Sequence, residues 1–156
     1  MSVLPDIPDD SALARLFSQA RVQAEAVWFS LPGGQRLFSA GDASDQLYYV
    51  RAGRLGAFRH EPGHDVQLLG VIRPGEPAGE MSLIADAPHS ADVVALRDSE
   101  IIAVPRDVFL EACEADTAVM IELAKLMMLR SRQAVTRGGA GEPSVFGFIS
   151  LGSGLL

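Results

Sequence analysis

Between residues 28 and 104 the chain is a series of short apolar segments separated by turn-forming residues. The clearest stops are Pro32-Gly33-Gly34, Gly41-Asp42 and Pro62-Gly63, because glycine and proline favour turns and interrupt regular structure. Short segments of apolar, aromatic and β-branched residues at close spacing predict a β-sandwich or jelly roll. We expect strands at residues 28–31, 37–38, 47–50, 55–59, 66–72, 90–95 and 100–104.

Helical patterns lie mainly at the two ends of this region. The last helix is apolar on more than one face between Val119 and Leu129. One face of this helix can pack on the barrel. The remaining apolar side chains need a second partner, which would be another copy of the chain or a neighbouring domain. We expect a helix from Asp10 or Ser11 to about residue 26, a short one at 81–85, another at 106–113, and the last from Asp116 or Thr117 to about 136.

Composition narrows the possible functions. With 156 residues and 48% apolar residues the chain predicts one globular domain. A net charge of −7 argues against a nucleic-acid binder. The single cysteine, Cys113, suits a reducing, cytoplasmic location. The acidic, proline-broken start is no signal peptide, and Glu122 and Lys125 interrupt the longest apolar run, so we expect no transmembrane segment.

The stretch from Gly75 to Ala95 carries the clearest site pattern. Gly75 and Gly79 precede a short helical segment, and Glu80 directly follows the second glycine. Backbone N–H groups at such a turn can surround an anion, and the helix N-terminus favours negative charge there. Glu80 beside these donors can hold a sugar hydroxyl. The pattern predicts a small pocket for a phosphorylated sugar.

This stretch resembles the phosphate-binding cassette of cyclic nucleotide-binding domains, found in bacterial catabolite activators and the protein kinase A regulatory subunit. The segment from Leu37 to Gly53 matches a second signature of the same family. The resemblance covers about residues 11–135. It implies a mainly β fold with flanking helices: a double-stranded β-helix, or jelly roll, with an N-terminal helix and two C-terminal helices. Matching positions are Ala78-Gly79-Glu80-Met81-Ser82-Leu83 and Pro88-His89-Ser90-Ala91.

The resemblance implies a site for cAMP or cGMP. Glu80 would bind the ribose 2′-hydroxyl, and the backbone from Gly79 to Ser82 together with the Ser90–Ala91 edge would bind the phosphate. The long helix would cover the base, with Met127 or Arg130 as a possible lid. No cofactor and no catalytic residue is implied. The predicted ligand-binding residues are Gly79, Glu80, Met81, Ser82, His89, Ser90 and Ala91.

His89 stands where the family has an arginine that binds the cyclic phosphate. Histidine is shorter and mostly neutral at pH 7. Losing a charge-assisted contact costs roughly 1.5–3 kcal/mol, or about ten- to hundredfold in affinity. We therefore expect weak cyclic-nucleotide binding. The alternative is that His89 is a surface turn residue with no role in the site.

Several segments resemble the amino-terminal domains of the neuropathy target esterase family of patatin-like phospholipases, among them LPGGQRLFSAGD and LYYVRAGRLGAF. This resemblance implies that the chain is part of a longer serine esterase or phospholipase, although the 156 residues contain no Gly-x-Ser-x-Gly nucleophile motif. We expect residues 1–10 to be a disordered arm, 11–136 the cyclic nucleotide-binding-like domain, and 137–156 a linker and the truncated start of a following domain.

Two functions remain open. The first is a non-catalytic regulatory sensor of a cyclic nucleotide or another small phosphorylated ligand. The second is a degenerate domain that serves dimerisation or docking through residues 119–129. A metal site, as in cupin jelly rolls, would need His60, His64 and His89 together, but two of these flank a proline-glycine turn that faces solvent.

Overall fold

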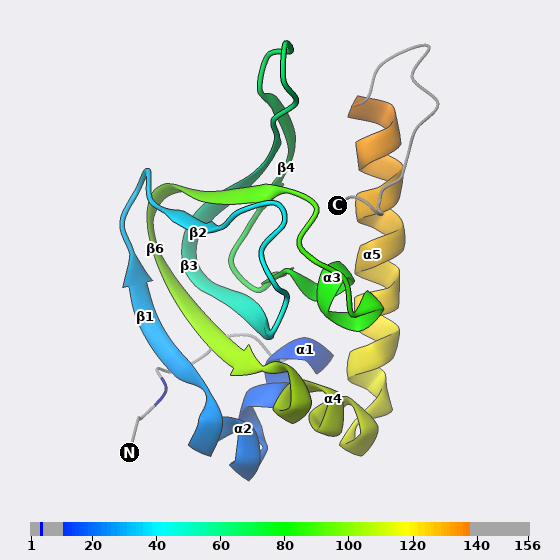
Figure 1. The fold of residues 1–156 in the computed structure, drawn as a ribbon. Helices are drawn as coiled ribbons and strands as arrows, with labels where there is room; N and C mark the ends of the chain where they lie inside the picture. Colours follow the sequence, from blue (N-terminus) through cyan, green and yellow to red (C-terminus); the bar gives the residue numbers. More distant parts are fainter. Residues whose placement is uncertain (1–3, 5–10, 138–156) are drawn as a thin grey trace.

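The computed structural model describes residue 4 and residues 11–137, arranged as a β-roll with helices at one end and a long helix beside it (Figure 1). The elements in order are α1 (Ala12–Arg15), the 3-10 helix η1 (Leu16–Ser18), α2 (Ala20–Glu25), β1 (Val27–Leu31), β2 (Arg36–Phe38), β3 (Gln46–Arg59), β4 (Gln67–Ile72), β5 (Pro77–Ala78), α3 (Glu80–Ala85), β6 (Asp92–Pro105), α4 (Arg106–Ala115) and α5 (Thr117–Arg137).

Two long strands, β3 and β6, form the spine of the roll. They pair antiparallel along most of their length, from Gln46 opposite Pro105 to Phe58 opposite Asp92. Shorter strands add to their two ends: β1 and β2 pair with β6, and β4 and β5 pair with β3. This curled antiparallel arrangement with flanking helices confirms the predicted jelly roll.

The structure corrects the predicted number of strands. Residues 47–50 and 55–59 belong to one strand, β3, and residues 100–104 continue the strand that begins at Asp92. At Gly53 the backbone has φ +96°, and the pairing register shifts on both sides of it. An added Cβ there would lie 2.5 Å from Ser99 Cα. Gly53 therefore marks a bulge that bends a continuous strand, where a turn was predicted.

The N-terminal helix is also interrupted. Ser11 is the N-cap and accepts a hydrogen bond from Ala14 N at 3.2 Å. Gln19 is extended, with ψ 134°, and its side chain donates to Ala112 O at 3.2 Å. This contact with α4 accompanies a break that local helix propensity does not predict. At α5, Asp116 takes the capping role by accepting from Ala118 N at 3.1 Å.

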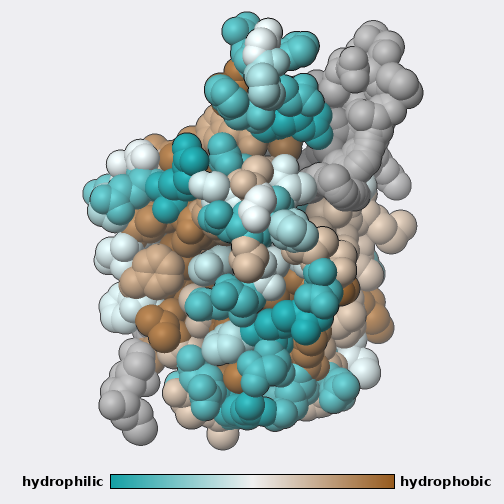
Figure 2. All heavy atoms as spheres, viewed as in Figure 1, coloured by the Kyte–Doolittle hydropathy of each residue, from teal (hydrophilic) through white to brown (hydrophobic). Residues whose placement is uncertain are grey.

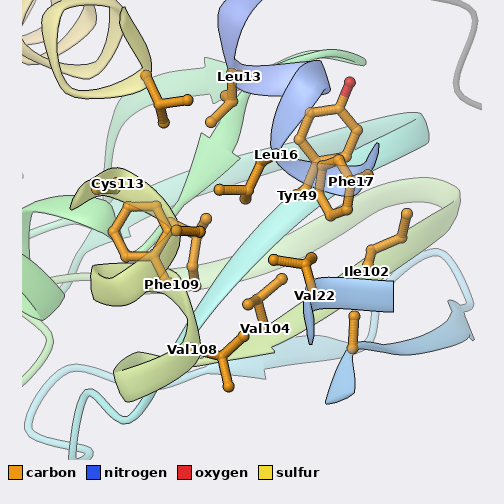
Figure 3. Packing of buried hydrophobic residues seen from close by; sticks show 14 of the residues in the cluster. Leu13, Leu16, Phe17, Val22, Tyr49, Ile102, Val104, Val108, Phe109 and Cys113 are labelled. Carbon is orange, nitrogen blue, oxygen red and sulfur yellow. The ribbon is translucent and has the colours of Figure 1, made fainter. Parts of the chain in front are cut away.

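Two hydrophobic clusters hold the fold together. One joins the helices to the end of the roll and includes the Phe17–Tyr49 ring pair, whose centroids are 4.7 Å apart (Figure 3). The other fills the roll and includes Val50, Leu55 and Ile101. On α5, Val119 and Leu123 are buried in the first cluster. The inner side of the long helix is thus fixed near its start.

The predicted domain limits are only partly within the described residues. The arm at 1–10, apart from Leu4, and the segment 138–156 lie outside them. Arg137, which we assigned to the linker, is the last residue of α5. Among the helices of residues 11–137, none is both long and apolar enough to cross a bilayer.

Candidate functional site

A cavity of about 140 Å³ lies between the roll, α3 and α5. The second half of β3, strand β4, the α3 segment, the segment leading into β6, and α5 all contribute to its wall. The structure brings all seven predicted binding residues to this wall: Gly79, Glu80, Met81, Ser82, His89, Ser90 and Ala91. Their role in binding a ligand stays a prediction, but their convergence on one concave surface is a property of the fold.

Gly79 sets the path of the chain into the site. Its φ is +83°, a left-handed conformation that glycine adopts without strain, and its carbonyl accepts from Leu83 N at 3.1 Å. An added Cβ would lie 3.0 Å from His89 Cε1. The turn therefore needs glycine both for its backbone angle and for the close approach of the imidazole.

Glu80 is buried and paired with a cation from the far end of the chain. Arg130 Nη1 donates to both carboxylate oxygens, at 2.9 and 2.8 Å, and the Glu80 side chain is only 3% exposed. Arg130 Nη2 lies 3.7 Å from Glu76 Oε1, too far for a hydrogen bond. Nη2 is buried and has no hydrogen-bond partner among the residues described. The site thus presents a paired carboxylate beside an unused N–H donor.

The predicted lid is partly as expected. Arg130 lines the cavity, whereas Met127 is not among its lining residues. Leu126 and Leu129, which we did not predict, contribute the apolar surface of α5 instead. The lid roles themselves stay predictions.

His89 is an interior residue, so the surface-turn alternative is wrong. It is 5% exposed and stacks on Phe38, with ring centroids 3.6 Å apart and planes 11° from parallel. Its backbone is held by hydrogen bonds with Asp42 O at 2.9 Å and Gly41 N at 2.8 Å. Burial lowers the pKa of His89, and the charges of Asp42 and Asp45 oppose this shift more weakly. A neutral imidazole therefore stands at the expected phosphate position.

Two other histidines and the cysteine do not line this cavity: His60, His64 and Cys113. His60 and His64 are exposed, and in the described part of the chain no group of three or more His, Cys, Asp or Glu side chains is arranged to hold a metal ion. Burial raises the pKa of the Cys113 thiol to about 11, which leaves it protonated and unreactive. At one end of the mostly apolar cavity, the Glu80 carboxylate is a hydrogen-bond acceptor and Arg130 Nη2 is a donor. Together they can bind a polar group of a ligand.

The cavity is enclosed by a glycine turn, a buried acid and the last helix of a jelly roll. This arrangement is typical of one class of protein, the ligand-binding β-roll domains. The family model described as "Cyclic nucleotide-binding domain" matches residues 28–116. This chain belongs to the cyclic nucleotide-binding domain family.

Relatives of two kinds are similar to the chain. Lysophospholipase nte1 of Neosartorya fischeri is 31% identical over 110 residues, which cover 70% of this chain but 7% of that protein. The Cyclic AMP receptor protein of Thermus thermophilus is 33% identical over 127 residues, covering 81% of this chain and 55% of that one. The crystal structure of Thermus thermophilus Catabolite Activator Protein superimposes with a TM-score of 0.65 at 31% identity, over 78% of this chain and 60% of that chain. The chain therefore spans a small fraction of the lysophospholipases.

Proposed function

We propose that this chain is a non-catalytic regulatory module that binds a cyclic nucleotide in the cavity between α3 and α5. The contact with the cyclic phosphate is weakened because a buried neutral imidazole, His89, replaces a guanidinium. The Thermus relative that is named for cyclic AMP supports cAMP as a candidate ligand. The buried, protonated thiol of Cys113 is compatible with a cytoplasmic location.

The observation that carries the proposal is the Glu80–Arg130 ion pair. It joins the first residue of α3 to α5 across 50 positions of sequence. A ribose hydroxyl that donates to Glu80 competes with Arg130 for the carboxylate. Ligand binding then changes how α5 is held against the roll, and a domain attached to α5 would sense that change.

Calorimetric titration of the 156-residue chain with cAMP and cGMP tests this proposal. We expect saturable binding that Glu80→Gln weakens about tenfold or more, because a charge-assisted hydrogen bond to the ribose is lost. Glu61→Gln removes the same charge from an exposed turn and is the matched control. Hydrogen exchange should show altered protection in α5 on binding. Absence of heat at millimolar nucleotide would refute a nucleotide sensor.

A second candidate function is a protein-interaction module, and the outer face of α5 supports it. Three apolar side chains of α5 that do not line the cavity are 38–66% exposed: Met120, Ile121 and Met128. Figure 2 shows hydrophobic side chains along the edge of the molecule formed by α5. Exposed apolar side chains grouped on one helix are typical of an interface. In a longer protein similar to the lysophospholipases, this face would meet a second copy or a neighbouring domain, and esterase activity would reside elsewhere.

A further inference from the structure

We propose that the cavity selects a hydroxyl-bearing ligand that carries no charge where it meets His89, so that a nucleoside binds at least as tightly as its cyclic monophosphate. This inference rests on the proposed function, because it assigns a ligand class to the same cavity. Three features carry it: the packing of His89, the charge balance of the wall, and the unused donor of Arg130.

The imidazole is closely packed, and its burial outweighs the opposing effect of the Asp42 and Asp45 charges on its pKa. Phe38 covers one face of the ring at a centroid distance of 3.6 Å, and Gly79 approaches it so closely that a methyl group there would contact Cε1 at 3.0 Å. Backbone hydrogen bonds to Gly41 and Asp42 fix the residue on both sides. Because the ring is 5% exposed, protonation at neutral pH is disfavoured. A phosphate placed here meets at most one neutral N–H donor from this side chain.

The rest of the wall does not supply the missing charge. The acidic and basic residues that line the cavity are Glu76 and Glu80 against Arg73 and Arg130, so their formal charges cancel. Arg130 is already engaged with Glu80 and lies near Glu76. Arg73 is exposed at the rim, where water screens its charge. Backbone N–H groups at the Gly79 turn can donate to an anionic ligand, but the side chains of the wall supply no net positive charge to balance it, and burial penalises an unbalanced charge.

The polar end of the cavity suits a hydroxyl better than a phosphate oxygen. A hydroxyl both donates and accepts, so it can donate to the Glu80 carboxylate and accept from Arg130 Nη2, the buried N–H group without a partner in the described residues. A phosphate oxygen only accepts and is repelled by Glu80. A donor and an acceptor side by side therefore favour an alcohol group. The remaining wall is aliphatic and suits the uncharged part of the ligand; it includes Leu69, Ile72 and Leu126.

Calorimetric titration at pH 7.5 with adenosine, guanosine, cAMP and cGMP decides the matter on the unmodified chain. We expect the better nucleoside to bind as tightly as, or more tightly than, its cyclic monophosphate. A cyclic monophosphate that binds tenfold more tightly than its nucleoside overturns this inference and leaves the proposed function intact. No saturable binding of any of the four at millimolar concentration overturns both.

A charge added at position 89 gives an independent test. His89→Arg should raise the ratio of cAMP affinity to adenosine affinity about ten- to hundredfold, because a charge-assisted contact to phosphate is restored and adenosine has no phosphate to make it. His64→Arg adds the same charge at an exposed turn and should leave the ratio of the two affinities unchanged. An unchanged ratio in a folded His89→Arg chain would also overturn the inference. If circular dichroism shows that this variant is unfolded, the titration of the unmodified chain still decides.

Discussion

Replacing Arg130 by methionine removes the only cation that an ion pair or hydrogen bond places on the Glu80 carboxylate within the described residues. The carboxylate is 3% exposed, so the variant leaves a buried charge without its partner. Breaking a buried pair in this way costs about 3–5 kcal/mol. We expect the lower end, about 3 kcal/mol, because the Arg130 side chain is itself 19% exposed and its loss opens a path for water. That is a large share of the ~5–15 kcal/mol that stabilises a domain.

Urea unfolding followed by circular dichroism measures this cost. Arg15→Met is the matched control, because Arg15 pairs with Asp116 at 2.9 Å but is 49% exposed, and such surface pairs contribute about 0–1 kcal/mol. Adding Glu80→Gln to Arg130→Met should recover at least half of the loss, since the buried group is then neutral. Equal costs for Arg130→Met and Arg15→Met would show that Glu80 is hydrated, and the reasoning about its burial would be wrong.

Three further outcomes are expected. The folded-state pKa of His89 lies below its unfolded value of about 6.5, so its contribution to stability is complete above pH 6.5 and is lost as pH falls from there to the folded pKa. His89→Gln should therefore reduce the fall in the free energy of unfolding between pH 7.5 and 5, by at most about 1.4 kcal/mol per pH unit, whereas the exposed control His64→Gln should not. Gly53→Ala should lower the free energy of unfolding in urea by about 3 kcal/mol or more, because Ser99 and Asp98 occupy the space for a methyl group. Gly63→Ala, at φ +80° with open space, should lower it by about 1 kcal/mol, and equal losses would contradict the steric argument. If α5 forms an interface, Ile121→Lys should convert a dimer to a monomer in light scattering, and an unmodified chain that stays monomeric at high concentration would refute self-association.

Local sequence signals were sufficient for most elements of the fold. Glycine, proline and aspartate marked where apolar segments end, and the long periodic pattern after Asp116 predicted α5 nearly to its last residue. They failed where a distant contact decided the local conformation. Gly53 bends β3 without ending it, because the strand continues to pair with β6 on both sides of the bulge. Gln19 lies at a break in the first helix, where its side chain reaches the end of α4, 93 positions away. Residue propensities contain no information on either contact.

The candidate site shows the same division between local and distant information. Its cassette is contiguous in sequence, and all seven predicted residues line the cavity. The charge state of the site is not local: Phe38, 51 positions before His89, contributes to the burial that keeps the imidazole neutral, and Arg130, 50 positions after Glu80, neutralises the acid. A sequence motif can therefore locate the pocket, yet the ligand that the pocket accepts depends on partners that only the fold brings together. In this chain the cassette places Glu80 and His89 on one wall, and Phe38 and Arg130 then set how each of them is buried and paired.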